Sequence, residues 1–251
     1  MVDLAPDAVQ WITPDWPAPA GVRALTSLRC GGVSRQGFAG LNLAQHVGDD
    51  PAAVRENRDR LLRAAAVPVE PCWLEQVHGA TVIDADDWQP GVQADAAYAR
   101  YPDVVCAVLT ADCLPVLLCA RDGSAVAAVH AGWRGLAAGV IEAAAHALGD
   151  GALIAWLGPA IGPQAFEVGE EVRAAFVAAD ADSAAAFCQS PAGRWRADIY
   201  QLARRRLRTV GITEVYGGGE CTHGDAARFY SYRRDGQTGR MASLIWREAG
   251  L

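Results

Sequence analysis

The sequence lacks the features that would assign it to the membrane, secreted or nucleic-acid-binding classes. No stretch approaches the roughly 18 consecutive apolar residues that a membrane span requires. The N-terminal segment MVDLAPDAVQWITPDWP has no basic part followed by an apolar part, so we expect no secretory signal and a cytoplasmic location. With 22 basic and 29 acidic residues the net charge is −7, which disfavours general binding to nucleic acid or to anionic membranes.

A disulfide framework is also missing. The seven cysteines lie at positions 30, 72, 106, 113, 119, 188 and 221, and no two of them form a C-x-x-C pair. In a cytosolic protein, an odd number of cysteines without regular spacing is expected to remain as thiols. Cys106 and Cys119 lie inside apolar runs, where a free cysteine is expected to be buried.

A basic cluster between residues 204 and 208 is the one segment that could indicate contact with nucleic acid. Apolar residues recur around it at helical spacing, namely Ile199, Leu202, Ala203, Leu207 and Val210. Three of its arginines, Arg204, Arg205 and Arg208, would then fall on the opposite face of a helix. We therefore favour a solvated helix face over a nucleic-acid site.

The composition is typical of a globular protein, with 51% hydrophobic and 20% charged residues. The length of 251 residues allows one large domain or two small ones. Because we find no internal repeat, low-complexity segment or linker rich in Gly and Ser, we predict a single domain over residues 1–251. Residues 180–190 have the loosest composition and are predicted to form a surface excursion.

Strand-like and helix-like segments are mixed along the chain, which predicts a layered α/β or α+β domain. Strands are predicted at residues 22–29, 72–77, 81–84, 152–157, 213–217 and 241–247. Three apolar runs have the length and the bounding turns of strands buried on both faces, at residues 103–110, 114–120 and 124–130. Helices are predicted at residues 50–66, 135–148, 168–179 and 198–210. Asp50 can cap the first helix, and Gly149 ends the second.

Three side chains at the edges of these elements are candidates for chemistry. His78 in WLEQVHGAT and His130 in AVAAVHAGWRG are two of only five histidines, and each stands beside or near a glycine. Cys113 lies in LTADCLPVLL, between two predicted buried strands. The ends of strands, where turns follow, are where α/β proteins usually place functional groups. If residues 72–77 continue as a strand, Val77 faces the core and His78 faces away from it.

The three side chains support two different chemistries. Catalytic zinc sites use three protein ligands and leave a fourth position open, and a His/His/Cys set is known. The spacings of 35 and 17 residues are wrong for a zinc finger but acceptable for ligands on separate strands. Alternatively, Cys113 could act as a nucleophile with His78 or His130 as its base. The residues alone leave zinc and thiol chemistry open.

The turn at residues 130–135 suggests a neighbouring anion site. Gly132 and Gly135 allow the backbone to approach a ligand closely. The start of the following helix offers free N–H groups and a positive dipole end, and Arg134 adds a charge. A surface salt bridge is the alternative role for Arg134. His46, in LNLAQHVGDD, is a further polar candidate.

Four other residues have roles that the sequence leaves open. Asp112 or Glu75 could act in proton transfer, although either could equally be a solvated or capping carboxylate. A non-catalytic zinc site would need a fourth protein ligand, and Cys221 or His223 in the segment ECTHGD could supply it.

Six motifs, in order, resemble one known family. They are LNLAQHVGDD, WLEQVHG, LTADCLPVLL, AAVHAGWRGL, GPAIGPQAFEVG and FYSYRRDGQTGRMASLIW, and they extend over about residues 15–247. These motifs are similar to those of the laccase-domain or polyphenol oxidase family, also called peptidoglycan editing factor. The resemblance implies a layered α/β/β/α fold, related to a toxin with a cysteine-hydrolase site. It also implies zinc held by His78, Cys113 and His130.

The resemblance implies a function as well. Family members are associated with phosphorolysis of adenosine, inosine and methylthioadenosine, and with adenosine deamination, so purine nucleosides and phosphate are the expected partners. Many relatives carry cysteines where this chain has Gln164 and Ala165. Those cysteines are not the metal ligands, so the difference leaves the expected site intact. The acidic composition permits a monomer or a weak oligomer.

Two alternative activities remain. The first is a hydrolase that edits peptidoglycan precursors, with Cys113 as nucleophile. The second is copper-dependent phenol oxidation, because divalent-metal affinities favour copper at such a site. Multicopper oxidases need many histidines in repeated H-x-H pairs, whereas this chain has five histidines and no such pair.

Overall fold

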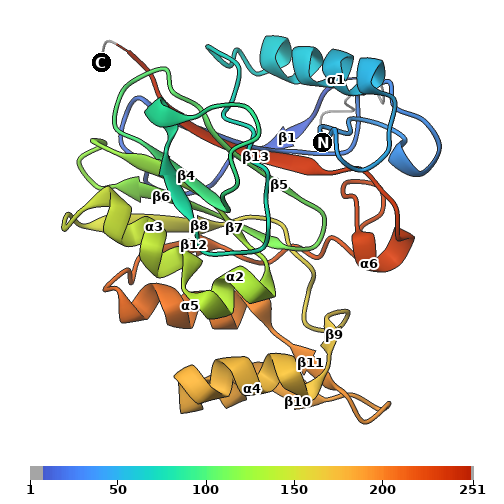
Figure 1. Ribbon diagram of the computed structural model, residues 1–251, viewed down its shortest axis with the longest axis vertical. Helices are drawn as coiled ribbons and strands as arrows, with labels where there is room; N and C mark the ends of the chain where they lie inside the picture. The colour runs from blue at the N-terminus through green and yellow to red at the C-terminus, as the bar shows by residue number, and fades with distance from the viewer. Residues whose placement is uncertain (1–7, 250–251) are drawn as a thin grey trace.

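The apolar runs of the sequence become strands in two stacked sheets (Figure 1). The computed structural model describes residues 8–249. The first sheet has the order β1 (Trp11–Ile12), β2 (Val22–Ser27), β13 (Met241–Arg247) and β5 (Cys106–Thr110). The second has the order β12 (Val215–Gly217), β8 (Leu153–Leu157), β6 (Leu114–Ala120), β7 (Val126–Ala131), β4 (Ala96–Ala99) and β3 (Val82–Asp84).

Alternation along the strands explains why both sheets are buried. On β6 all seven residues are buried. Leu117 and Cys119 pack between the two sheets, whereas Val116 and Leu118 pack under the helices on the other face. This arrangement confirms the prediction that the run at 114–120 is a strand covered on both sides.

Helices cover the two outer faces, which confirms the α/β/β/α order (Figure 1). The helix α1 (Pro51–Ala64) packs on the four-stranded sheet, and the side chain of Asp50 accepts a hydrogen bond from the Ala52 amide at 2.9 Å. The six-stranded sheet is covered by α2 (Trp133–Ala138), α3 (Val140–Leu148) and α5 (Ile199–Thr209). The short helix α6 (Tyr232–Asp235) precedes β13.

The helix predicted at 135–148 is interrupted. Gly139 adopts a left-handed conformation with φ +92°, which ends α2 and starts α3 in a new direction. Glycine tolerates this conformation without the steric cost that a Cβ would bring. The break matters for the site, because it leaves α2 as a short helix directly after the β7 strand.

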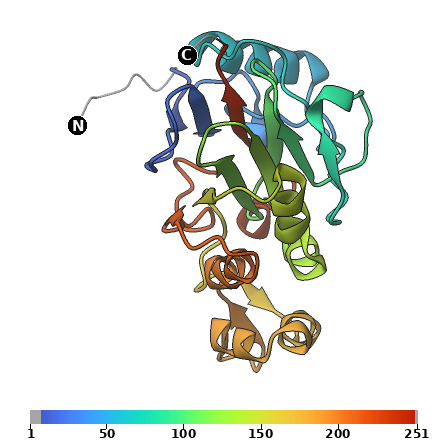
Figure 2. The ribbon, with the colours of Figure 1, turned by 90° about the vertical axis from the view of Figure 1, so that its left-hand side faces the viewer.

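Residues 180–190, predicted from their loose composition to form a surface excursion, have regular secondary structure and are partly exposed. They form a 3-10 helix, η3 (Ala181–Ala186), and the strand β10 (Phe187–Gln189). That strand joins β9 (Glu167–Val168) and β11 (Trp195–Ala197) in a small antiparallel sheet. With α4 (Glu170–Ala179) this sheet lies beyond α5, at the bottom of Figures 1 and 2. The alanines of this segment give no clear helix or strand pattern in the sequence. In the structure, Phe187 is buried against Phe176.

The strand predicted at 72–77 does not form. Its backbone makes only isolated bridges, at Cys72 and at Glu75. The side-chain amide of Gln76 replaces a strand partner, because it donates to the Leu109 carbonyl at 2.8 Å and accepts from the Leu109 amide at 2.7 Å. Val77 is 48% exposed, so the expectation that it enters the core was wrong.

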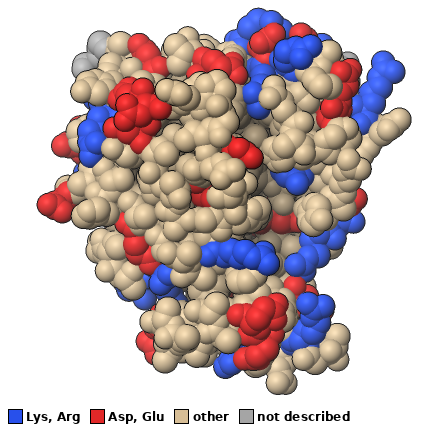
Figure 3. All heavy atoms as spheres, viewed as in Figure 1, with Lys and Arg blue, Asp and Glu red and all other residues tan. Residues whose placement is uncertain are grey.

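Arg204, Arg205 and Arg206 of α5 are half-buried and bound to protein groups, and only Arg208 of this cluster is exposed as predicted. Arg204 donates to the carbonyls of Val215 and Gly217, and Arg205 forms an ion pair with Asp180 at 2.6 Å. Figure 3 shows basic and acidic side chains in small interspersed groups on one face of the molecule. These bound guanidinium groups argue against the cluster as a nucleic-acid site.

None of the helices within residues 8–249 combines the length and the hydropathy that crossing a membrane would demand.

Candidate functional site

The structure brings His78, Cys113 and His130 together, although 52 positions separate the first from the last. One potential ligand atom from each side chain lies within 4.8 Å of the others. The Sγ atom of Cys113 is 3.9 Å from Nε2 of His78. The two imidazole rings meet edge to face, with centroids 4.8 Å apart.

The group lies where the layer between the two sheets ends. Val126 and Ala128 on β7 fill that layer, and His130 follows in the same alternation. Cys113 directly precedes β6. Strand alternation places it on the same face as Pro115 and Leu117, and Leu117 packs between the two sheets. Strand alternation therefore places two of the three side chains at one end of a shared apolar layer.

His78 reaches the group from a turn rather than from a strand. Its φ of +61° is unusual for a residue with a side chain. Three consecutive amides, those of Val77, His78 and Gly79, donate to the carboxylate of Asp95 at 3.3, 2.9 and 2.6 Å. This carboxylate therefore fixes the turn that presents the His78 ring.

Asp95 also orients the second histidine. It is fully buried, and its Oδ1 accepts a hydrogen bond from Nδ1 of His130 at 2.7 Å. Although burial opposes ionisation, the hydrogen bonds from His130 and Gly79 lower the pKa of Asp95, so it is a carboxylate. Nε2 of His130 remains available to Cys113 or to a metal ion. A carboxylate behind a metal-binding histidine is a common arrangement.

Asp95 was not identified from the sequence. The only signal was an acidic residue inside the small apolar segment ADAAYA, just before β4. An isolated acidic residue in such a segment must be paired when it is buried. The sequence could not show which partner it pairs with.

Charge coupling activates the thiol of Cys113. Burial raises its pKa, but the charge of His130 and hydrogen bonds from His130 and His78 lower the pKa of Cys113 to about 6. Burial lowers the pKa of His130, but the Cys113 thiolate and the Asp95 carboxylate raise it to about 9. At neutral pH the metal-free pair is a thiolate beside an imidazolium.

Gly132 provides the space for this group. A Cβ at this position would lie 3.0 Å from Cδ2 of His78 and 3.2 Å from Sγ of Cys113. A Cβ at Gly135 would lie 2.5 Å from the carbonyl oxygen of Gly79. The glycines of the 130–135 turn thus permit close approach, as expected. The groups that lie close to them are His78, Cys113 and the Gly79 carbonyl.

Asp112 holds the opposite rim of the site. Its φ is +92°, its Oδ1 accepts from the Thr222 hydroxyl at 2.6 Å, and its Oδ2 accepts from the Arg233 amide at 2.7 Å. Both oxygens are therefore used to position other segments. Glu75, the other candidate for proton transfer, is exposed and does not line the cavity.

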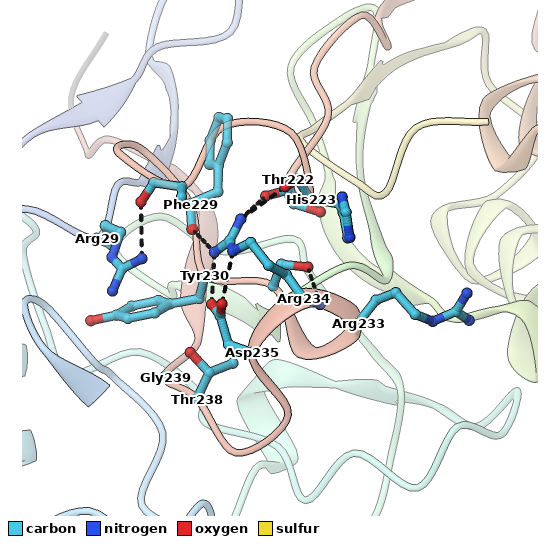
Figure 4. Close-up of polar contacts among 12 residues, drawn as sticks. Arg29, Thr222, His223, Phe229, Tyr230, Arg233, Arg234, Asp235, Thr238 and Gly239 are labelled. Carbon is cyan, nitrogen blue, oxygen red and sulfur yellow. Dashed lines mark hydrogen bonds and ion pairs between the residues drawn. The ribbon is translucent and has the colours of Figure 1, made fainter. Parts of the chain in front are cut away.

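Arg234 ties the loop at Thr222 and His223 to α6 (Figure 4). Its guanidinium forms a two-pronged ion pair with Asp235 and donates to the carbonyls of Thr222 and His223. Its second Nη also donates to the Phe229 carbonyl at 2.9 Å. Arg233, the preceding residue, points away from this network in Figure 4.

The group opens into a cavity of about 360 Å³. This volume is within the roughly 300–1,000 Å³ typical of small-molecule sites. Other polar residues that line it are His46, Gln76, Thr110, Asp112, Arg134, Tyr232, Arg233 and Arg240. His46 and Arg134 were expected near the site from the sequence, whereas Thr110, Arg233 and Arg240 were not identified.

The three donors fit a metal ion. Two imidazoles and one thiolate are a donor set used by catalytic zinc sites, with a fourth position left for water or substrate. Within residues 8–249, no fourth His, Cys, Asp or Glu joins the group. Cys221 instead accepts a hydrogen bond from the Gly162 amide at 3.2 Å. The geometry favours an open site over a closed structural one.

Comparison with known proteins was made on the whole chain. Residues 23–248 match the family described as multi-copper polyphenol oxidoreductase laccase. A Pseudomonas aeruginosa protein named purine nucleoside phosphorylase is 58% identical over 239 residues, which are 94% of this chain and 98% of that protein. The Escherichia coli purine nucleoside phosphorylase YfiH is 54% identical over 238 residues, with coverage of 94% and 98%.

Solved structures agree with these sequence matches. A crystal structure of a Neisseria meningitidis protein has a TM-score of 0.91 and 47% identity, and covers 95% of this chain and 99% of its own. The crystal structure of YlmD from Geobacillus stearothermophilus has a TM-score of 0.87 and 32% identity, with coverage of 97% and 100%.

Proposed function

This chain belongs to the multi-copper polyphenol oxidoreductase laccase family, and from that membership and its site we propose that it is a zinc-dependent purine nucleoside phosphorylase. The observation that carries the proposal is the His78, Cys113 and His130 group, open to a cavity with three arginines on its wall. Adenosine, inosine and methylthioadenosine are the proposed substrates. Adenosine deamination at the same site would use water in place of phosphate.

The cavity offers the surfaces that a nucleoside needs. Leu109, Ile161 and Phe166 provide apolar walls against which a purine can pack. Arg134, Arg233 and Arg240 make the lining positive, which favours a phosphate dianion. Enclosure in such a site also keeps water from competing with phosphate.

The reaction transfers a ribosyl group from a purine to phosphate. An oxygen of hydrogen phosphate forms a bond to C1′ of the ribose, and the bond between C1′ and the purine nitrogen breaks. The electron pair of that bond goes to the purine, which takes up the proton of hydrogen phosphate, leaving ribose 1-phosphate. A zinc ion held by His78, Cys113 and His130 would supply Lewis-acid chemistry there. Asp95 keeps His130 in the ligating orientation.

The decisive experiment measures metal content and inosine cleavage with and without phosphate. We expect bound zinc and phosphate-dependent release of hypoxanthine, both lost in Cys113→Ala. The matched control is Cys188→Ala, because Cys188 is exposed on β10 outside the cavity lining. Activity that survives complete zinc removal but disappears after thiol alkylation would contradict the proposal.

One observation favours a second candidate, a cysteine hydrolase acting on peptidoglycan precursors. Cys113, His130 and Asp95 are arranged as the nucleophile, base and orienting carboxylate that such enzymes use. Amide hydrolysis by metal-free protein, abolished by Cys113→Ala, would establish it. Phenol oxidation is tested in the same preparations by loading copper and measuring oxygen consumption.

A further inference from the structure

Arg240 is a half-buried cation on the cavity wall. Its Nη1 donates to the carbonyls of Thr238 and Gly239 at 2.8 and 3.0 Å. Its Nε and second Nη make no hydrogen bond within residues 8–249, and no carboxylate of that part of the chain forms an ion pair with it. A partly desolvated guanidinium with two free donors is suited to an anionic ligand.

Arg240 is one of several half-buried arginines that form no ion pair within residues 8–249, and among these it is the one that lines the cavity. Arg206 and Arg234 are also half-buried, and each forms an ion pair, with Glu142 at 3.0 Å and Asp235 at 2.7 Å. The chain contains no lysine, so arginine is the permanently charged side chain available to bind phosphate. Of the three arginines that line the cavity, Arg134 and Arg233 are exposed, and only Arg240 is half-buried.

A second, independent feature lines the same cavity as Arg240. Thr110 lines the cavity, is 1% exposed, and its hydroxyl has no hydrogen-bond partner within the described part of the chain. It is the register partner of Met241, the residue that follows Arg240. A buried hydroxyl without a partner costs free energy. Rotation about its Cα–Cβ bond exchanges the hydroxyl with the methyl group, so the donor can turn to a ligand.

His46 completes this wall. It lines the cavity, and the Leu43 amide of the same loop donates to the Arg240 carbonyl at 3.3 Å. Burial and the charges of Arg240 and Arg58 lower the pKa of His46, although Glu75 opposes this shift. A neutral imidazole can still donate one hydrogen bond to a phosphate oxygen.

We propose that Arg240, with Thr110 and His46, binds the attacking phosphate on the wall contributed by the four-stranded sheet. This inference rests on the proposed phosphorolysis and assigns the phosphate to a place different from the 130–135 turn. Cys113 and His130 lie at β6 and β7 of the six-stranded sheet and His78 lies on a turn, so both sheets contribute to the site. At the turn, the space above Gly132 is already filled by His78 and Cys113, and Arg134 stacks on Trp133.

Kinetics with variants of single residues test the assignment. We expect Arg240→Met to raise the KM for phosphate about tenfold or more, with the KM for inosine changed less than about twofold. Arg240→Lys should give an intermediate KM, because it keeps the charge but loses the planar fork. Arg208→Met is the control, because Arg208 is exposed and far from the cavity lining.

Direct phosphate binding separates this inference from the proposed function. In the absence of nucleoside, millimolar inorganic phosphate should raise the Tm of the wild-type protein, and Arg240→Met should abolish the rise. That result supports the site even if inosine is not cleaved. If Arg134→Met loses the response and Arg240→Met retains it, the phosphate binds at the 130–135 turn and the inference is wrong.

Two of the buried threonines, Thr26 and Thr110, give a matched pair. Thr26 donates or accepts a hydrogen bond with Ser243 at 2.7 Å, whereas Thr110 has no partner. Thr26→Val should lower the Tm and leave the KM for phosphate unchanged. Thr110→Val should keep or raise the Tm and increase the KM for phosphate a few-fold. An unchanged KM in a stable Thr110→Val protein removes Thr110 from the site.

Discussion

The carboxylate of Asp95 and the imidazole of His130 share a 2.7 Å hydrogen bond in an almost fully buried position. The same carboxylate receives three amides of the turn that carries His78. One side chain thus fixes two of the three proposed metal ligands. Because the turn has no strand ladder to hold it, Asp95 replaces the missing backbone partners.

Asp95→Asn should therefore lower the affinity for the metal ion strongly, with a smaller effect on the structure of the site. The amide cannot accept from all four donors, and it removes the charge behind His130. We expect zinc affinity to fall about 10–100-fold, as is usual when a carboxylate behind a metal-binding histidine is lost. Competition with a chromogenic chelator measures this, with Asp122→Asn, an exposed turn residue, as control. Unchanged affinity would show that Asp95 only shapes the fold.

Gly132→Ala should displace the ligands. The added methyl would lie 3.0 Å from His78 and 3.2 Å from Cys113, so both must shift by a few tenths of an ångström. We expect a loss of about 1–3 kcal/mol in the free energy of unfolding, together with weaker zinc binding. Gly151→Ala is the matched control, because its Cβ would meet no heavy atom within 4 Å. Urea unfolding with and without zinc distinguishes the two effects.

The pH dependence of thiol alkylation should reveal the activated cysteine. Because the pKa of Cys113 is lowered to about 6, its thiolate persists at neutral pH and is lost only as the pH falls through about 6. In metal-free protein the alkylation rate should therefore reach half its maximum near pH 6, whereas the pKa of Cys119 is raised to about 12 and that thiol should stay unlabelled. Mass spectrometry identifies the site, and zinc should protect it. A midpoint near 8.5, the ordinary value, would contradict the proposed charge coupling.

Arg234→Met should destabilise the rim of the cavity. The substitution leaves the Asp235 carboxylate and the Thr222 carbonyl without their partners. For this partly exposed ion pair we expect a loss of about 2 kcal/mol in the free energy of unfolding. Activity should fall as well, since Thr222 also holds Asp112. Arg35→Met, at an exposed residue without an ion pair in the described chain, should change neither quantity.

Most of the layered fold could be predicted from local patterns in the amino-acid sequence. The run at 114–120 is apolar at every position, and such a segment is stable only when both of its faces are covered. Short-range chemistry also determined the start of α1 at Asp50 and the end of α3 at Gly149. The sequence also identified His78, Cys113 and His130 as candidates, because the two histidines stand near glycines at the ends of predicted strands and Cys113 lies between two predicted strands.

The contacts between these residues could be identified only from the tertiary structure. Asp95 acts through contacts with positions 77–79 and 130, and no local pattern reports a partner so far along the chain. The same holds for Thr110 and Arg240, which line one cavity because β5 pairs with β13. Local sequence fixes backbone preference and burial over a few residues. The partner of a buried polar group depends on which strands pair and in which register, and that is a property of the whole chain.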